Sequence, residues 1–281
     1  TASFMAGGSW ARGFSGNAER DHKRDHEDNR TRNRPIGRAR PAQRHTPRPM
    51  PENETLAVVI GASGGIGAAL AAELSRAPRR QKVIALSRRS DPPVDLLDEA
   101  SIADAARFLS GLDVPVRLVV DATGFLHDER FAPERRLQDI DPDHMAQAFR
   151  INAIGPALLM KHFLPLLPRT GRSVFATLSA KVGSIGDNRL GGWYSYRASK
   201  AALNQLVRTA SIELRRRCPD AVCVALHPGT VDTSLSAPCG KDGLEVRPAS
   251  EAARLLVDVL ETLQPAQSGG FFDYRGRALP W

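Results

Sequence analysis

The sequence predicts an α/β fold in which one doubly wound parallel sheet carries helices on both faces. Residues 56–60 form a short, continuously apolar run, as expected for a strand that is buried on both faces of a parallel sheet. A glycine-rich turn follows at 61–67 and leads into a helical pattern. Strand and helix patterns then keep alternating to the end of the chain, which favours a parallel sheet covered by helices.

Each element is predicted from its own pattern. Apolar runs of strand length predict about seven strands, at 56–60, 82–87, 93–97, 116–121, 172–179, 221–227 and 270–274. Longer segments with helical spacing predict helices at 66–77, 100–111, 142–167, 193–217 and 249–263. No internal repeat or linker interrupts residues 55–281, so we expect one domain there. Its ligand is expected at the carboxyl ends of the strands, where the strand order reverses.

Residues 1–54 differ from the rest of the chain in composition. The first fifty residues hold eleven Lys and Arg against five Asp and Glu, so they contribute +6 to the overall formal charge of +8. They lack apolar periodicity and cannot bury enough surface to offset the entropy of ordering, so we expect a disordered basic tail. The acids interleaved through 19–28 disfavour a nucleic-acid-binding arm and a transit peptide. In place of a functional arm, we expect residues 1–49 to be sequence upstream of a true start at Met50.

The sequence also disfavours a membrane protein, a disulfide-stabilised protein and a metalloprotein. No run of about 18 apolar residues is present, so no membrane span is expected. The three cysteines form no metal-ligand pattern, and an odd number offers no disulfide framework. We therefore expect a cytoplasmic protein without a metal site.

The glycine-rich turn has the chemistry of a nucleotide-binding loop. Its glycines follow the spacing G-x-x-x-G-x-G between a predicted strand and a predicted helix. Glycine permits close approach of the backbone to a pyrophosphate, and the helix N-terminus offers N–H groups and the positive end of a dipole. We expect the cofactor to contact Gly61, Ser63, Gly64, Gly65, Ile66 and Gly67.

The end of the second predicted strand indicates which dinucleotide binds. Ser87, Arg88 and Arg89 stand where NAD-binding proteins place an acid that binds the ribose 2′-hydroxyl. Arginines suit a 2′-phosphate, through charge-assisted and often bidentate hydrogen bonds, so the sequence favours NADP. The alternative is a pair of surface arginines without a ligand. Asp95 and Leu96, on the next predicted strand, are expected beside the adenine, although Asp95 could equally be a helix cap.

Tyr196 and Lys200 are the candidate catalytic pair. They lie four residues apart in a predicted helix, so their side chains share one face. The Lys200 ammonium could lower the pKa of Tyr196 and make the phenol a usable proton donor near neutral pH. The spacing is common by chance and becomes informative because a nucleotide loop lies upstream. Together the two features predict an enzyme that moves a hydride and a proton.

With these motifs in place, residues 55–281 resemble the short-chain dehydrogenase/reductase family, and within it the C-factor type and the sniffer-type carbonyl reductases. The resemblance depends on the order and separation of motifs that are each weak alone. It implies a Rossmann fold. The motifs are the glycine loop, Asp121-Ala-Thr-Gly124, Asn152, Leu178-Ser-Ala-Lys-Val-Gly-Ser184, Tyr196-x-x-x-Lys200 and Pro228-Gly-Thr-Val-Asp-Thr233.

The resemblance implies a role for each motif. Tyr196 would protonate the carbonyl oxygen as hydride arrives from the nicotinamide. Lys200 would bind the nicotinamide ribose and lower the pKa of the phenol, and Asn152 would anchor a water of the proton relay. Asp121 departs from the family pattern, which has an amide at its position. Further cofactor contacts would come from Ala122, Thr123, Gly124, Pro228, Gly229, Val231 and Thr233.

The serine that the family uses to bind the substrate oxygen is missing from its usual place. The family has it three residues before a glycine, and counting back from Gly183 gives Ala180. Ser179 is the first choice to replace it and Ser184 the second. Because adjacent strand residues point to opposite faces, Ser179 can do so only where the strand end twists or bulges.

The sequence as a whole predicts an NADP(H)-dependent oxidoreductase that acts on a small carbonyl or alcohol. A different class stays open, because the missing serine and the link of C-factor-like relatives with intercellular signalling also fit a signalling or scaffold protein that binds NADP with little turnover. We expect a small-molecule substrate, and neither nucleic acid nor a membrane as a partner. The helices at 142–167 and 193–217 could pair two copies, which leaves a homodimer or homotetramer open.

Overall fold

The computed structural model describes residues 54–76, 81–237, 243 and 245–281. The expectations for residues 1–53 of the basic tail, and for a start at Met50, therefore lie outside the described residues. All described residues belong to the unit Pro49–Trp281. None of the described helices is both long and apolar enough to cross a membrane.

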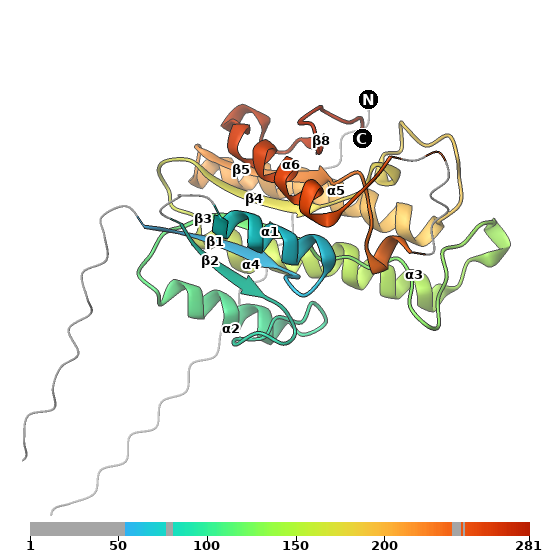
Figure 1. Cartoon of the computed structure of the whole chain (residues 1–281), viewed down its shortest axis with the longest axis horizontal. Helices are drawn as coiled ribbons and strands as arrows, with labels where there is room; N and C mark the ends of the chain where they lie inside the picture. Colours follow the sequence, from blue (N-terminus) through green and yellow to red (C-terminus); the bar gives the residue numbers. More distant parts are fainter. Residues whose placement is uncertain (1–53, 77–80, 238–242, 244) are drawn as a thin grey trace, which may run out of the picture. The chain divides into compact units, whose positions relative to one another are not determined.

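Six strands form one parallel sheet in the order β2-β1-β3-β4-β5-β8 (Figure 1). The chain leaves β1 for β2 on one side and comes back to β3 on the other side, so the strand order reverses between β1 and β3. Sheets of this kind bind ligands at the carboxyl ends of those two strands. The strands are β1 Thr55–Ile60, β2 Gln81–Leu86, β3 Val116–Asp121, β4 Ser173–Leu178, β5 Ala221–His227 and β8 Phe271–Asp273, with a separate pair of β6 Thr230–Val231 and β7 Val246–Arg247.

Helices cover both faces of the sheet, which confirms the predicted fold class. Alternate strand residues point to opposite faces, so Val58 and Phe175 belong to one apolar core, and Val59 and Ala176 to the other. Full burial of a side chain such as Phe175 stabilises the fold by roughly 1.5–3 kcal/mol. Helices α2, α4 and α5 pack on the first face, and α1 and α6 on the second (Figure 1). The helices are α1 Gly65–Arg76, α2 Glu99–Ser110, α3 Pro142–Phe149, α4 Gly155–Phe163, α5 Tyr194–Arg217 and α6 Ala249–Thr262.

The strand predicted at 93–97 is wrong, because these residues form a loop that leads into α2. Pro92 and Pro93 lack the N–H groups that a strand ladder needs. The N–H of Asp95 donates instead to Ser101 Oγ at 2.9 Å. Val94 made the segment look like a strand because it is apolar. In the structure its side chain is buried in the core, although the backbone is a loop.

The single helix predicted over 142–167 is interrupted. A five-residue π-helical turn, Arg150–Ile154, separates α3 from α4, and the N–H of Gly155 donates to the carbonyl of Arg150. Pro156 explains the interruption, because it has no N–H to donate to the carbonyl of Asn152 four residues earlier. Single π-helical turns of this kind are common at functional sites.

Candidate active site

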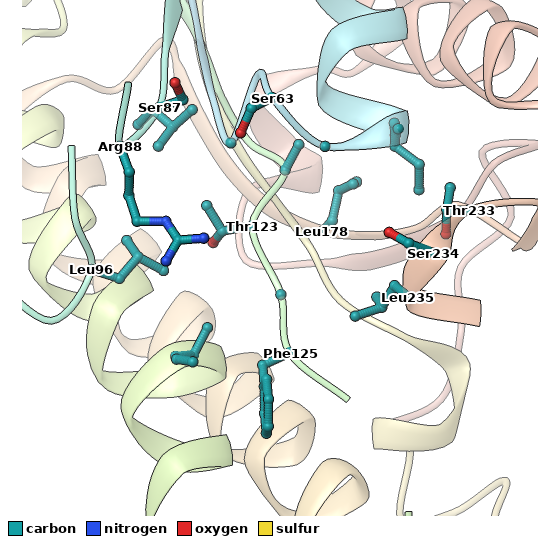
Figure 2. A pocket seen from close by; sticks show the side chains of 18 of the residues that line it. Ser63, Ser87, Arg88, Leu96, Thr123, Phe125, Leu178, Thr233, Ser234 and Leu235 are labelled. Carbon is teal, nitrogen blue, oxygen red and sulfur yellow. The ribbon is translucent and has the colours of Figure 1, made fainter. Parts of the chain in front are cut away.

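A cavity of about 780 Å³ opens at the carboxyl ends of β1, β3 and β4 (Figure 2). It lies beside the point where the strand order reverses, as expected. No group of His, Cys, Asp and Glu side chains in the described part of the chain could hold a metal ion. The predicted residues that line the cavity are Gly61, Ser63, Gly64, Gly65, Ile66, Ser87, Arg88, Arg89, Asp95, Leu96, Ala122, Thr123, Gly124, Ser179, Tyr196, Lys200, Pro228 and Thr233.

The glycine loop connects β1 to the first turn of α1, and its shape depends on glycine. Gly61 has φ +81°, a backbone conformation that other residues rarely adopt. Gly67 does not line the cavity and has a packing role, since a Cβ there would lie 2.2 Å from the Gly61 oxygen. A Cβ on Gly65 would lie 2.8 Å from Thr233 Cγ2, so the loop after β5 approaches the glycine loop closely. The result is a tight cradle at a helix N-terminus without acidic residues in its first turn.

Arg88 lies at the end of β2, as predicted, on the wall that leads away from the glycine loop. Figure 2 shows its guanidinium pointing into the cavity between Leu96 and Thr123. Leu96 in turn packs against Gly155, where a Cβ would lie 2.8 Å from Leu96 Cβ. Asp95 Oδ1 accepts from the N–H of Leu97 at 3.0 Å, so this carboxylate caps its own loop while it lines the cavity.

Asp121, which replaces the family's amide, organises the end of β3. It is fully buried and accepts hydrogen bonds from the Thr123 backbone N–H at 3.0 Å, the Thr123 hydroxyl at 2.5 Å and the Thr177 hydroxyl at 2.6 Å. Burial raises the pKa of Asp121, while these hydrogen bonds and the charge of Lys200 oppose the rise. The carboxylate therefore ties the end of β3 to β4.

Tyr196 and Lys200 come together in the cavity from the first two turns of α5, as the spacing predicts. Lys200 Nζ donates to the carbonyl of Leu178 at 2.8 Å and lies 5.9 Å from the centre of the Tyr196 ring. Gly183 allows this approach, because a Cβ there would lie 2.8 Å from Lys200 Cβ. Lys200 is only 2% exposed, and burial lowers its pKa to about 8, an effect that the charge of Asp121 opposes.

The depressed pKa of Lys200 predicts a pH dependence of stability. Between its folded pKa of about 8 and its ordinary value of 10.5, the folded state binds fewer protons than the unfolded state. Burial of the Lys200 charge therefore destabilises the folded state by its full amount below pH 8. The stability of the fold then rises as pH increases from 8 toward 10.5. Replacing Lys200 with methionine should remove this dependence.

Denaturant unfolding of both proteins across that pH window measures the effect. The stability gained by Lys200→Met over wild type should be largest below the folded pKa and shrink toward high pH by roughly 3 kcal/mol at most, since one pKa unit is about 1.4 kcal/mol. Lys82→Met, at an exposed lysine of β2, is the control. A difference between Lys200→Met and wild type that stays constant with pH would contradict the burial argument.

Asn152 lies in the π-helical turn and does not line the cavity itself. Its Oδ1 accepts from the N–H of Phe125 at 2.8 Å, and its Nδ2 donates to the Phe125 carbonyl at 2.7 Å and to Ser199 Oγ at 3.1 Å. Ser199 Oγ donates to the carbonyl of Tyr196 at 2.9 Å. The side chain of Asn152 therefore links the segment after β3 to the helix that carries Tyr196.

The two candidate serines differ in position. Ser179 lines the cavity and donates from its buried hydroxyl to Asn204 Oδ1 at 2.7 Å. Ser184 is buried outside the cavity wall, and its Oγ accepts from the Asp187 N–H at 3.1 Å. Of the two, only Ser179 reaches the cavity.

The segment after β5 contributes less to the cavity than the family pattern implies. Pro228 and Thr233 line it, whereas Gly229 and Val231 do not. Val231 is buried. Gly229 has φ +82° and packs against Tyr274, whose ring atoms would lie 3.0 Å from a Cβ.

Sequence reasoning missed Phe125, Gln147 and Ile151 at the far end of the cavity. This end is lined by Phe125, His127, Asp128, Gln147, Ile151 and Leu235. Gln147 Nε2 donates to Asp128 Oδ2 at 2.9 Å, and His127 Nε2 donates to the Ser234 carbonyl at 3.1 Å. Desolvation raises the pKa of Asp128, but the hydrogen bonds from the Phe131 N–H, Gln147 and the Arg130 N–H together outweigh it, so the pKa lies below its ordinary value. The four-residue spacing of Gln147 and Ile151, just before Asn152, could have indicated a helix face toward the site.

Comparisons with known proteins show what the chain is similar to. Residues 61–261 match the family model described as Enoyl-(Acyl carrier protein) reductase. The chain is 40% identical over 146 residues to the C-signal protein of Myxococcus xanthus, which covers 52% of this chain and 83% of that protein. It is 31% identical over 192 residues to 1-hydroxy-2-glutathionyl-2-methyl-3-butene dehydrogenase of a Rhodococcus species, which covers 68% of this chain and 80% of the enzyme.

Solved structures with the same fold include two carbonyl reductases. The carbonyl reductase Sniffer of D. melanogaster has a TM-score of 0.70 at 23% identity, covering 82% of this chain and 100% of that chain, a likeness that shows the fold. An NADPH-bound carbonyl reductase from chicken fatty liver has a TM-score of 0.72 at 25% identity, covering 82% of this chain and 95% of that chain. The family model spans most of the chain, and the predicted motifs meet around one cavity. The chain therefore belongs to the short-chain dehydrogenase/reductase family of oxidoreductases.

Proposed function

We propose that this protein is an NADP(H)-dependent oxidoreductase that transfers a hydride between the nicotinamide and a small carbonyl or alcohol. One observation carries the proposal: Tyr196 and the buried Lys200 line the same cavity as the glycine cradle and Arg88. Membership of an oxidoreductase family supports the class of reaction. The NADPH-bound carbonyl reductase of similar structure supports both the cofactor and the carbonyl substrate.

The cavity walls fit a dinucleotide that carries a 2′-phosphate. The cradle around Gly65 has no room for a Cβ, and the first turn of α1 presents N–H groups without a competing acid. The Arg88 side chain has no hydrogen-bond or ion-pair partner among the residues that the structure describes. A guanidinium that points into a cavity without such a partner can form charge-assisted hydrogen bonds with a phosphate group. Ser63, Ser87 and Arg89 would add polar contacts.

In this proposal, residues of the chain donate the proton and position its donor, and NADPH, when bound, supplies the hydride. Tyr196 donates its phenolic proton to the carbonyl oxygen of the substrate. The Lys200 ammonium beside the ring favours the phenolate that remains, and it would bind the nicotinamide ribose of the bound cofactor. Asn152 holds the backbone of Phe125 and, through Ser199, the turn of α5 that carries Tyr196. Ser179 is proposed as the second hydrogen-bond donor to the substrate oxygen, which requires its hydroxyl proton to turn from Asn204 Oδ1 toward the substrate.

The cofactor preference can be tested at Arg88. Replacing Arg88 with alanine should raise the Kd for NADPH about 10–100-fold, because hydrogen bonds to a charged group contribute about 1.5–3 kcal/mol. The Kd for NADH should change less than about twofold, since NADH has no 2′-phosphate. Fluorescence titration of both nucleotides measures the two constants.

The matched control for Arg88 is Arg107→Ala, at an exposed arginine that pairs with Asp104 on α2. It should leave both constants unchanged. Wild-type protein that does not bind NADPH would overturn the proposed function, and equal weakening of NADPH and NADH in Arg88→Ala would overturn the role of this arginine.

A second candidate function is a cofactor-binding signalling or scaffold protein with little turnover. Ala180 favours it, because removing a hydrogen-bond donor to the reacting oxygen typically costs about 10²–10³-fold in rate. The similarity to the C-signal protein also favours it. NADPH binding without reduction of benzaldehyde, cyclohexanone or menadione would support this alternative.

A further inference from the structure

A buried polar cluster lies behind the cavity, at the start of α5. Glu134, His144 and Ser195 are each at most 3% exposed, and none of them lines the cavity. Glu134 Oε1 accepts the hydroxyl proton of Ser195 and lies 3.3 Å from His144 Nδ1. Burying an ionisable carboxyl group is costly unless it gains such partners, so the cluster needs a structural or functional explanation.

Glu134 acts as a cap for α5, although it lies sixty-one residues before Ser195. The residue at the usual capping position, Trp193, makes no side-chain cap hydrogen bond, and the first turn of α5 contains no acid. Instead, both carboxylate oxygens of Glu134 lie 3.3 Å from the Ser195 N–H, and the Glu134 carbonyl accepts from the Trp193 N–H at 2.5 Å. A carboxylate at a helix N-terminus satisfies free N–H groups and interacts favourably with the helix dipole.

The backbone that enters α5 depends on this external support. Gly191 and Gly192 have φ +65° and Trp193 has φ +52°, so three successive residues adopt the left-handed conformation. That conformation is unfavourable for Trp193, which has a Cβ. The contacts of Glu134 with Trp193 and Ser195 hold the strained entry in place, and Tyr196 is the next residue.

His144 connects the same cluster to the far end of the cavity, where Phe125 lies. Its ring stacks on Phe131, with 4.9 Å between ring centres, and meets Phe125 edge-on at 5.9 Å. Phe125 lines the cavity and is held by Asn152 through its backbone. Glu134 is therefore linked to the cavity in two ways: through Ser195 to the start of α5, and through His144 to Phe125.

The cluster does not have the arrangement of a hydrolytic triad. In such a triad the imidazole lies between the nucleophilic hydroxyl and the acid. Here the acid lies between Ser195 and His144, and Ser195 is fully buried. The geometry of the cluster therefore favours a role in holding the start of α5 over a catalytic reaction at Ser195.

We propose that Glu134 is a positioning residue for Tyr196, acting through Ser195 and the first turn of α5. The inference rests on the proposed function, in which Tyr196 donates the proton. Loss of the carboxylate allows the first turn of α5 to shift, while the cofactor cradle, which the loop between β1 and α1 forms, stays intact. Loss of the Glu134 carboxylate should therefore lower turnover and leave the affinity for the cofactor unchanged.

The kinetic test compares Glu134→Ala, Glu134→Gln and wild type with NADPH and benzaldehyde, cyclohexanone or menadione as probes. We expect Glu134→Ala to lower kcat on the order of 10²-fold, the cost of misplacing a catalytic group by about 1 Å, with the Kd for NADPH within about twofold. Glu134→Gln should be intermediate, because its amide oxygen still accepts from the Ser195 N–H. Asp139→Ala is the control, since Asp139 organises the same loop through Arg136 and does not contact α5.

Ser195→Ala provides a milder variant for the case in which Glu134→Ala does not fold. It removes only the hydroxyl partner of Glu134 and should lower kcat about tenfold, as expected from one lost hydrogen bond. Wild-type kcat in both Glu134→Ala and Ser195→Ala would overturn the proposal. It would also be overturned if Glu134→Ala lost NADPH affinity and turnover together while Ser195→Ala behaved as wild type, because the role would then be structural only.

A spectroscopic readout separates this inference from the proposed function. Trp193 lies edge-on to the Tyr196 ring at 6.2 Å, and it is the sole tryptophan once Trp10 and Trp281 are replaced by phenylalanine. In that background, Glu134→Ala should shift the Trp193 emission and increase its quenching by acrylamide. If wild type reduces no probe, the proposed function fails, while this measurement still shows whether Glu134 holds the entry to α5 in place. Unchanged Trp193 emission and quenching would overturn it.

Discussion

Replacing Tyr196 with phenylalanine should lower kcat for NADPH-dependent carbonyl reduction by about 10²–10⁴-fold, the usual contribution of a positioned general acid. The ring is kept, so its edge-on contact with Trp193 and its position beside Lys200 should persist. The Kd for NADPH should therefore change by less than about twofold. Steady-state oxidation of NADPH with a reducible probe, together with a fluorescence titration, measures both effects.

Tyr194 provides the matched control for this substitution. It is half-buried in the same turn of α5 and does not line the cavity. Tyr194→Phe should keep kcat within about twofold of wild type, because removing a hydroxyl away from the reacting atoms removes no transition-state interaction. A Tyr196→Phe protein that turned over as fast as wild type would rule out Tyr196 as the proton donor.

Replacing Gly67 with alanine should abolish tight NADPH binding and destabilise the fold. The added Cβ would lie 2.2 Å from the Gly61 oxygen and 2.8 Å from its carbonyl carbon, and both are backbone atoms that cannot rotate away. α1 must therefore move off the loop that forms the cradle, and overpacking of this kind costs about 1–3 kcal/mol. We expect a lower Tm and a Kd for NADPH that is raised on the order of 10²-fold, because the loop N–H groups lose their alignment.

Gly111→Ala is the control for this prediction. Gly111 caps α2 with ordinary helical angles, and a Cβ there would lie 3.4 Å from its nearest neighbour, the Phe108 oxygen. It should leave NADPH binding unchanged. If Gly67→Ala bound NADPH as wild type does, close packing of α1 on the loop would not be required for the cradle.

The parts of the fold that depend on local patterns could be predicted from the sequence. The continuous apolar run of β1 predicts a strand buried on both faces, and the glycines after it predict the turn and the start of α1. The spacing of Tyr196 and Lys200 fixes their common face on α5. The exception is instructive: Val94 made 93–97 look like a strand, but Pro92 and Pro93 remove the donors that a strand needs.

The rest depends on contacts between residues far apart in the sequence. Nothing near Glu134 indicates that its carboxylate caps a helix that begins sixty residues later, because capping is normally a local pattern. Similarly, the hydrogen bond from Ser179 to Asn204 depends on how the end of β4 packs against α5. The π-helical turn at Asn152 was in principle readable from Pro156, which removes one helical hydrogen bond.

The most direct test of the central claim is the transfer of deuterium from labelled NADPH to a carbonyl probe. With deuterium at the hydride position of the nicotinamide, the wild-type protein should produce an alcohol that carries one deuterium on the former carbonyl carbon, as mass spectrometry can show. Tyr196→Phe should produce the same labelled alcohol at a much lower rate. Wild-type protein that binds NADPH and gives no labelled alcohol from any aldehyde or ketone would contradict the account.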